Sequence, residues 1–457
     1  MIYLDNAATS LVRPPEVGEA IVAALTQAGN SGRGTGDASN ATAYMMYQLR
    51  ANLASFFGLG VRQAAHVIFT KNATEALNLA ILSLLPTYLA SKARDQGEVQ
   101  SGKTADASLR NVAVPPTALD PLPRSLPPLP ESLLSRPPHI IVADWNHNSV
   151  LRPLYRLEDM GLVKLDIWRS GVQAGLPGQG LLDLGDLDRL YQPETQALVV
   201  SHASNLTGNA LDLRALGTWT KDRKLLFLVD AAQSAGHLPI DMEAMGIDLL
   251  ALTGHKALLG PQGTGALLVH LPHILEKNPA FALDKCVPLM AGGAGILSFD
   301  RDQPPMAPER FEAGTLNGHS LAGWLAAMEY LQKEGLDKIH QGEMILLRKL
   351  YEGLVGLPDL RIYGDFCKEV WESGQRTPVL SFNLGKTSSN FVAEALAERF
   401  EIACRAGAHC APLMHEALGT TDQGAVRFSL NAFTTLEEVE AGVGAVKTLV
   451  EEGFASK

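Results

Sequence analysis

The chain has 457 residues, of which 46% are hydrophobic and 19% are charged, and its formal net charge at pH 7 is −11. This length predicts two lobes, and the negative charge argues against nucleic acid as the main partner, because phosphate binding needs clustered Lys and Arg. Since we find no run of about 18 apolar residues and no signal-peptide pattern at the start, we expect neither a membrane protein nor a secreted one.

Short apolar runs alternate with helical patterns from about residue 66 onward, which is typical of a parallel sheet covered by helices. A helix is predicted at 73–85. The predicted strands of this region are 66–70, 139–143, 197–201, 225–230, 248–253 and 260–270. The pattern therefore indicates an α/β lobe.

Residues 91–138 interrupt this alternation, and their second half is rich in proline. Proline fixes φ and removes an amide donor, so we expect an irregular surface insertion here, with a proline-rich recognition arm as the alternative. From residue 320 onward the sequence pattern changes, and it predicts amphipathic helices at 320–335 and 340–356. Further short patterns at 379–385, 394–400, 402–407 and 425–431 then predict a smaller α+β lobe.

Four widely spaced cysteines, Cys286, Cys367, Cys404 and Cys410, fit a reducing cytoplasm better than a disulfide framework. We therefore expect a cytoplasmic enzyme. Cys410, in the stretch RAGAHCAP, is compatible with a buried core residue, a metal ligand beside Cys404, His409 and His415, a disulfide partner or a reactive thiol. The spacing of that cluster fits no zinc pattern, but it does not decide among the other roles.

Polar residues follow five of the predicted strands, at the edge where open α/β sheets bind ligands. They are Lys71–Glu75, Asp144–Asn148, His202–Asn205, Asp230 with Gln233, and Thr253–Lys256. Taken singly, each has an ordinary structural reading, such as helix capping by Asn72 and Thr74 or turn capping by Asp230. Their joint placement at one edge favours a binding site.

The chemistry of these residues matches one cofactor. The helix start at 72–74 suits a phosphate, Asp230 suits a protonated ring nitrogen, and Lys256 could form an imine with an aldehyde. Phosphate, protonated pyridine and aldehyde together describe pyridoxal 5'-phosphate (PLP). His147 could stack on the ring, and Gln233 could bond its phenolic oxygen.

A series of motifs then resembles a known family. In chain order they are YLDNAATS, FTKNATEALNLAI, NHNSVLRPL, SHASNLTGN, VDAAQSAGHLPIDM, LTGHKALLGPQGTGALLV, FEAGTLN, RAGAHCAPLMHEALGT and AVRFSLN. The chain resembles the class V aminotransferase-fold cysteine desulfurases, especially the short-loop, group II-like branch with its selenocysteine lyase relatives. The resemblance runs from Tyr3 to about Asn431, apart from residues 91–138.

This resemblance implies the PLP-dependent transferase fold type I, in which a large α/β domain with a mainly parallel seven-stranded sheet joins a smaller α+β domain. The large PLP-binding domain is expected at 15–330, with the proline-rich insertion at about 91–138. The small domain, formed by 1–14 and 331–457, would carry the catalytic cysteine loop.

The resemblance also assigns roles to single residues. The expected catalytic residues are Lys256, which binds the cofactor, Cys410, which accepts the sulfur, and His147, which stacks on the ring. The expected cofactor-binding residues are Ala73, Thr74, His147, Asp230, Gln233, Thr253, His255, Lys256 and Thr315. The substrate carboxylate is expected at Asn205, Arg405 and Arg427, and no metal is implied. Thr315 matches a contact that relatives donate from the neighbouring subunit, so a homodimer is implied.

The implied reaction converts L-cysteine to L-alanine and leaves the sulfur on Cys410 as a persulfide, with a sulfur-acceptor protein as a further partner. His409 and Arg405 could favour the thiolate form of Cys410. Selenocysteine lyase, another class V PLP aminotransferase or lyase, and a non-catalytic sulfur-carrier scaffold are the alternatives. The chain departs from many relatives at Asn146, which precedes the stacking histidine, and at Ala408.

Overall fold

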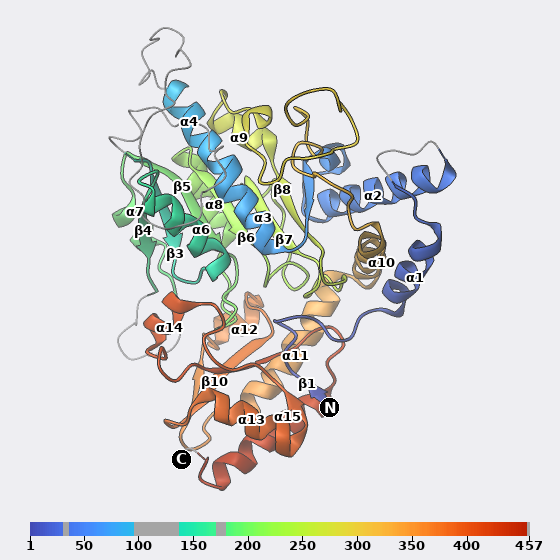
Figure 1. Ribbon diagram of the computed structural model, residues 1–457. Coiled ribbons are helices and arrows are strands. Elements are labelled where there is room, and N and C mark those ends of the chain that lie inside the picture. The colour runs from blue at the N-terminus through green and yellow to red at the C-terminus, as the bar shows by residue number, and fades with distance from the viewer. Residues whose placement is uncertain (31–35, 96–136, 171–179, 455–457) are drawn as a thin grey trace, which may run out of the picture.

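The computed structural model describes residues 1–30, 36–95, 137–170 and 180–454 (Figure 1). Its centre is a seven-stranded sheet with the spatial order β2-β8-β7-β6-β5-β3-β4. The strands are β2 (Val67–Thr70), β3 (His139–Ala143), β4 (Lys164–Trp168), β5 (Thr195–Ser201), β6 (Leu226–Asp230), β7 (Leu249–Thr253) and β8 (Gly265–Val269). Only β8 runs antiparallel to its neighbours β2 and β7. The predicted mainly parallel sheet is therefore confirmed.

Helices cover both faces of this sheet, so its central strands are buried on both faces. In β3, Ile140 and Val142 join one core cluster, while Ile141 and Ala143 join the cluster on the opposite face. The helices of this region are α1 (Pro15–Gln27), α2 (Asp37–Phe56), α3 (Ala73–Leu79), α4 (Leu85–Asp95), α6 (Asn148–Asp159), α7 (Gly185–Leu190), α8 (Leu213–Asp222), α9 (Leu271–Lys277) and α10 (Gly318–Glu334). Short helical turns lie at Val61–His66, Ala80–Leu84 and Leu283–Lys285.

The C-terminal part forms a second layered unit, below the large sheet in Figure 1. A three-stranded antiparallel sheet has the order β12-β10-β9, and β1 pairs with β11 in a separate parallel pair. Its strands are β1 (Ile2–Tyr3), β9 (Leu360–Tyr363), β10 (Val379–Leu384), β11 (Ile402–Ala403) and β12 (Val426–Ser429). Its helices are α11 (Leu336–Leu354), α12 (Lys368–Ser373), α13 (Ser389–Phe400), α14 (Pro412–Leu418) and α15 (Leu436–Glu451). Leu4 from the N-terminus packs into the core of this unit.

Two predicted elements have different bounds in the structure. The strand expected at 402–407 is only Ile402–Ala403, since the chain then turns toward Cys410. The helix expected at 73–85 continues to Asp95 through a wider turn at Ala80–Leu84. Most of the proline-rich insertion, residues 96–136, lies outside the described residues, and the domain boundaries stay a prediction.

One helical stretch in the described chain, Ala73–Lys92, is long and apolar enough to cross a membrane, although the sequence led us to expect none. Within the protein, 78% of its most apolar window is buried. Its apolar side chains, such as Leu77, Ile81 and Leu85, belong to the core on one face of the large sheet. Core helices of this kind pass the same test, so length and composition here are weak evidence for a membrane span.

Candidate active site

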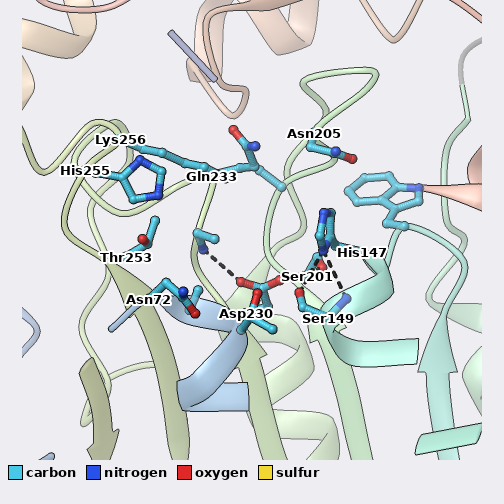
Figure 2. A pocket seen from close by; sticks show the side chains of 15 residues that line it. Asn72, His147, Ser149, Ser201, Asn205, Asp230, Gln233, Thr253, His255 and Lys256 are labelled. Atoms are coloured by element: carbon cyan, nitrogen blue, oxygen red, sulfur yellow. Dashed lines mark hydrogen bonds between the residues drawn. The ribbon is translucent and has the colours of Figure 1, made fainter. Parts of the chain in front are cut away.

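A cavity lies outside the carboxyl ends of the large sheet's strands, at the edge to which the sequence assigned the polar residues. It holds about 510 Å³ of space, its open mouth included, which is within the range of small-molecule sites. Figure 2 shows Lys256, Gln233 and Asn205 on its loop side and Asp230 at the strand ends. Its lining residues are Asn72, Ala73, Thr74, Trp145, His147, Ser149, Ser201, Ala203, Asn205, Asp230, Ala232, Gln233, Thr253, His255 and Lys256.

Asp230 is the buried acid on the strand side of this cavity. It ends β6 and lies in register with Ser201 of β5. Its Oδ1 accepts from the Ala232 backbone N–H at 2.9 Å, and its Oδ2 accepts from Ser201 Oγ at 3.4 Å. Burial raises the pKa of this carboxyl, and the Ala232 N–H and the charge of Lys256 oppose that rise. A cationic ligand group placed here would favour the carboxylate further.

Lys256 is carried on the loop that follows β7. A glycine at 254 is required in this loop, because a Cβ there would lie 2.1 Å from Thr264 Oγ1. Burial lowers the pKa of the Lys256 amine to about 8, although the Asp230 carboxylate opposes this effect. The side chain is therefore partly neutral near pH 8, and a neutral amine is a nucleophile.

His147 caps a helix and also lines the cavity. It is the N-cap of α6, and its Nδ1 accepts from the Ser149 backbone N–H at 3.0 Å. Burial, followed by the charge of Lys256, lowers the pKa of His147 to about 4, so the ring is neutral. Because Nδ1 accepts a hydrogen bond, the ring hydrogen is on Nε2. The neutral ring faces the cavity while it caps the helix.

The other end of the cavity is rich in groups that can bind an anion. Asn72 caps α3 by accepting from the Glu75 backbone N–H at 2.9 Å, and the chain folds closely here, because a Cβ on Gly265 would lie 2.7 Å from Asn72 Cα. Thr253 Oγ1 is buried without a hydrogen-bond partner in the described structure. An unsatisfied hydroxyl of this kind is suited to a polar ligand.

The N-terminal segment contributes contacts to the site that the sequence did not reveal. Thr9 Oγ1 lies 3.0 Å from His255 Nδ1, and Ser10 Oγ donates to the Lys256 backbone oxygen at 3.0 Å. Gln233 Nε2 donates to the Ala7 oxygen at 3.1 Å. The motif YLDNAATS carried part of the family resemblance, but nothing in its spacing predicted that it holds the Lys256 loop.

Arg427 and Arg405 lie at the loop side of the site, on antiparallel backbone segments that pair directly. The side chain of Arg427 is buried, and it donates through Nη1 to the Asn205 oxygen at 3.0 Å and through Nη2 to Asp5 Oδ1 at 2.8 Å. Its Nε is buried without a partner in the described structure, whereas Arg405 is exposed. Two guanidinium groups near Lys256 form a positive pole, and their charges lower the pKa of that lysine.

Cys410 lies on a tight turn beside this pole and is exposed. His409 and Cys410 both have positive φ angles, +48° and +54°, which are uncommon for residues with side chains. The Asn148 N–H donates to the Cys410 oxygen at 2.9 Å, and Asn205 Nδ2 donates to the His409 oxygen at 2.7 Å. These two bonds fix the turn against the loops that begin α6 and follow β5.

His409 does not supply a positive charge to Cys410, contrary to what its position in the sequence suggested. Its ring is buried, and Nε2 lies 2.9 Å from the Ala425 oxygen. Burial, followed by the charge of Arg427, holds the pKa of His409 well below its usual value, so the ring is neutral. Arg405 is exposed five positions before Cys410, and Arg152 and Arg156 line a hollow that also contains Cys410.

Comparison with known proteins identifies the family. A family model for aminotransferase class-V matches residues 2–96 and 128–441. The chain belongs to the aminotransferase class-V family. A probable cysteine desulfurase of Methanothermobacter thermautotrophicus is 32% identical over 305 residues, 66% of this chain and 70% of that protein. Another of Pyrococcus abyssi is 29% identical over 99% of this chain and 94% of the relative.

Solved structures agree with this class V assignment. The apo cysteine desulfurase of Thermococcus onnurineus NA1 matches with a TM-score of 0.77 at 29% identity, covering 99% of this chain and 95% of that one. The cysteine desulfurase CsdA of Escherichia coli, at 24% identity, shares the fold with a TM-score of 0.74. The family resemblance, the fold class and the expectation of a PLP-dependent enzyme related to cysteine desulfurases are confirmed.

Class V enzymes use PLP, and the groups in the cavity fit it. Thr253 Oγ1 and Asn205 Oδ1 are buried without partners in the described chain, Asp230 is a buried acid, and Lys256 has an amine that burial brings toward neutrality. Bound here, PLP would supply an aldehyde for an amine substrate and a ring that accepts electrons. We expect Asp230 to hold its ring nitrogen.

Thr315 is the one predicted cofactor-binding residue that does not line the PLP cavity. It lines two grooves formed by α2 and by the segments at 69–79 and 289–321, and it is not among the residues that line the PLP cavity. One chain of this class V protein therefore does not bring Thr315 to its own cavity.

The metal alternative considered for Cys410 has little support in the geometry. His409 pairs with the Ala425 oxygen, and His415 Nδ1 lies 2.7 Å from Thr420 Oγ1. In the described chain, the group with metal-binding spacing is instead Glu243, His270 and His273. There His270 Nδ1 accepts from the His273 N–H and Nε2 lies 2.7 Å from Glu243, so that ring acts as a helix cap.

The lowered pKa of Lys256 gives a testable pH dependence. Below pH 8 the amine is mainly protonated and cannot attack the PLP aldehyde, and above pH 8 it is mainly neutral. We expect the rate of PLP incorporation into cofactor-free protein to rise roughly tenfold per pH unit and to level off near pH 8. Visible absorbance after rapid mixing measures this rate. A rate that climbs toward the pKa of an ordinary lysine, about 10.4, would contradict it.

Thr9 is expected to set the ring hydrogen of His255. Arg13 and Gln262 donate toward Thr9 Oγ1. The Thr9 hydroxyl can itself donate either to His255 Nδ1, which is 3.0 Å away, or to the His255 backbone oxygen, which is 3.3 Å away, and Nδ1 is the closer of the two. A hydrogen bond to Nδ1 leaves Nε2–H free to donate to phosphate. Thr9→Val should therefore weaken PLP binding about fivefold, which is about 1 kcal/mol. Thr9→Ser keeps the hydroxyl and should bind PLP normally in the same equilibrium dialysis. Equal weakening in both variants would reject this role.

Proposed function

We propose that this chain is a PLP-dependent cysteine desulfurase, which converts L-cysteine to L-alanine and places the sulfur on Cys410 as a persulfide. One observation carries the proposal: the exposed Cys410 thiol lies on a turn that hydrogen bonds fix to the loops lining the PLP cavity. The names of the relatives from Methanothermobacter and Pyrococcus support it.

The two arginines would hold the substrate. Arg427 has an unpartnered buried Nε, and Arg405 lies directly opposite it on the paired backbone. Guanidinium groups bind carboxylates strongly, so the carboxylate of L-cysteine would lie at this pole. Asn205 supports the arrangement, because its backbone oxygen accepts from Arg427 and its side chain fixes the Cys410 turn.

Lys256 and Cys410 would then carry out different steps of the reaction. The Lys256 amine, whose pKa is about 8, can take the α-proton and later return a proton to carbon. The Cys410 thiolate attacks the substrate sulfur, a new S–S bond forms, and the C–S bond breaks with its electron pair left on carbon. The carbon is then protonated to give alanine, so no external oxidant is needed. Asp230 would hold the protonated ring nitrogen of PLP.

A homodimer is part of the proposal. Thr315 lies outside the cavity of its own chain but on a groove that it shares with Tyr47 of α2. Large hydrophobic side chains are exposed on α1, on α2 and on the segment after the short helical turn at Leu283–Lys285. They are Val22, Leu25, Tyr44, Tyr47, Ile296, Leu297 and Phe299. Exposed apolar side chains of this size favour a covering partner, and a second copy would bring Thr315 to the neighbouring site.

A cytoplasmic location also belongs to the proposal. All four cysteines are within the described residues and none pairs with another there. A persulfide enzyme needs a reducing compartment to keep its thiol active, and a sulfur-acceptor protein would remove the product sulfur.

The proposal is tested by supplying the PLP-loaded protein with L-cysteine and dithiothreitol and measuring both products. We expect alanine and sulfide in equal amounts. Neither product, alanine without sulfide, or activity on L-selenocysteine alone would contradict the proposal.

The role of Arg427 gives a separate prediction. Arg427→Lys keeps the positive charge but loses the planar set of donors, and a charge-assisted hydrogen bond contributes about 1.5–3 kcal/mol. We therefore expect KM for L-cysteine to rise roughly 10- to 100-fold, with a much smaller change in kcat. The thermal midpoint must be measured in parallel, because Arg427 is buried and paired with Asp5. A loss of kcat at unchanged KM would place Arg427 outside substrate binding.

A further inference from the structure

Arg427, to which the proposed function assigns the substrate carboxylate, already contacts a carboxylate of its own chain. Its Nη2 donates to Asp5 Oδ1 at 2.8 Å, and its Nη1 donates to the Asn205 backbone oxygen at 3.0 Å. Its Nε is buried and has no hydrogen-bond partner among the described residues. Within one chain, Arg427 is therefore only partly free to bind a ligand.

Asp5 contacts the side of the guanidinium that a substrate carboxylate would use. Nε and Nη2 form one side of this planar group, and a carboxylate binds such a side with two parallel hydrogen bonds. Asp5 accepts from Nη2, whereas Nε is the donor that lacks a partner in the described chain. A substrate carboxylate that binds through Nε must therefore share Nη2 with Asp5 or displace Asp5 from it.

The backbone on both sides of Asp5 is held in place. The Leu4 N–H donates to the Ala403 oxygen at 2.8 Å, and the Asn6 N–H donates to the Ser429 oxygen at 3.4 Å. Leu4 also packs into the core of the C-terminal unit. The Asp5 side chain can thus change its rotamer, but its backbone stays paired with β12, the strand that carries Arg427.

Asp5 also compensates the charge of the arginine. Burial lowers the pKa of Arg427, and the Asp5 carboxylate is the main group that opposes this effect. The side chain of Arg427 is 2% exposed and that of Asp5 is 19% exposed, so water screens this pair only partly. Because the pair is nearly neutral as a unit, a second carboxylate gains less from it than from an unpaired guanidinium.

We propose that Asp5 is a competitor for the substrate carboxylate that is built into the chain, and that it limits how tightly Arg427 holds substrate and product. This inference rests on the proposed function, in which Arg427 binds the carboxylate of L-cysteine. L-Alanine, the proposed product, has the same carboxylate, so a weaker hold on this group also favours product release. Asp5 sets the affinity of the site and takes no part in proton or sulfur transfer.

The test compares Asp5→Asn with the original chain, both loaded with PLP. The amide oxygen of asparagine can still accept from Nη2, so Arg427 keeps its orientation while the negative charge is lost. The probe is isotope-labelled 3-mercaptopropionate, which has the carboxylate and the thiol of cysteine but no amine to react with the cofactor. We expect Asp5→Asn to bind it about fivefold more tightly in equilibrium dialysis, the factor for removing one like charge about 4 Å away in water.

Two controls locate this effect at the carboxylate. The neutral analogue 3-mercaptopropionamide should bind the original chain and Asp5→Asn with affinities within about twofold of each other. Glu19→Gln removes one negative charge from an exposed position on α1, and it should bind 3-mercaptopropionate as the original chain does. In a separate assay of activity, KM for L-cysteine should fall about fivefold in Asp5→Asn, because the substrate has the same carboxylate.

The thermal midpoint gives a second readout, because Asp5→Asn leaves a buried guanidinium without its counter-ion. A bound carboxylate replaces the missing charge. At one concentration of 3-mercaptopropionate, the midpoint should therefore rise more in Asp5→Asn than in the original chain. Asp5→Ser removes the same charge and keeps an oxygen on the side chain, so it should show the same gain in affinity and serves if Asp5→Asn does not fold.

An affinity for 3-mercaptopropionate that is unchanged or lower in the folded variants would overturn the inference. An equal gain for the neutral amide would overturn it as well, because the effect would then not involve the carboxylate. If Arg427→Lys bound the probe as tightly as the original chain, the substrate carboxylate would not lie at Arg427. That result would overturn the substrate site of the proposed function, and this inference with it.

Discussion

Cys410→Ala should reduce sulfide formation from L-cysteine at least about 1,000-fold, because none of the other three cysteines of the described chain lines the PLP cavity or the hollow that adjoins it. Cofactor binding should be unchanged, since Cys410 is not among the residues that line the PLP cavity. The two readouts are sulfide release with dithiothreitol and the visible absorbance of the bound cofactor. A variant that still released sulfide at a tenth of the normal rate or faster would show that the sulfur leaves by another route.

The other cysteines provide matched controls for this result. Cys404 is six positions before Cys410, but burial raises its pKa to about 12, so it is a thiol rather than a thiolate at neutral pH. Burial raises the pKa of Cys286 to about 12 as well. Cys367 is exposed but lies in a different hollow, away from the PLP cavity. Cys367→Ala and Cys404→Ala should therefore keep near-normal sulfide release.

Lys256→Ala should lose more activity than Cys410→Ala, because it removes both the amine that binds the cofactor aldehyde and the base that moves the α-proton. We expect a decrease in alanine formation on the order of 10,000-fold or more. The visible absorbance of the bound cofactor should change as well, unlike in Cys410→Ala. Alanine formation is measured after a long incubation with L-cysteine, so that residual activity can be counted.

Lys71→Ala is the control for this variant. Lys71 is an exposed lysine that follows β2, on the same edge of the sheet, but it does not line the PLP cavity. Its substitution should leave both readouts within about twofold of the original chain. If Lys256→Ala retained substantial alanine formation while Lys71→Ala lost it, the assignment of the catalytic lysine would be wrong.

The large sheet could be predicted from the sequence because its central strands are buried on both faces. All residues of β3 are buried, and the predicted range 139–143 is the observed one. The strand β4 was missed, because it is at the edge of the sheet and carries Lys164 and Asp166 among its apolar residues. A polar edge strand lacks the continuous apolar run by which a buried strand is recognised.

Most of the cavity was predictable for a topological reason. Parallel strands deliver their carboxyl ends to one edge, so Asp230, His147 and Lys256 could be placed together without coordinates. Contacts between distant segments follow no period. The ion pair between Asp5 and Arg427 joins residues 422 positions apart, and only the folded chain reveals it.

The turn at Cys410 was beyond sequence reasoning for a different reason. Positive φ angles are usually signalled by glycine, yet here they fall on His409 and Cys410. The preceding residues predicted a longer strand in which neighbours point to opposite faces. The hydrogen bonds from Asn148 and Asn205 instead stabilise the turn, and both donors lie more than 200 positions away.

A single turnover tests the central claim most directly. The PLP-loaded protein is mixed with L-cysteine in the absence of reductant, alanine is counted, and the peptide that contains Cys410 is examined by mass spectrometry. The proposed function predicts one alanine per active site and one additional sulfur atom on Cys410. Alanine without sulfur on Cys410, or sulfur found on a different residue, would contradict it.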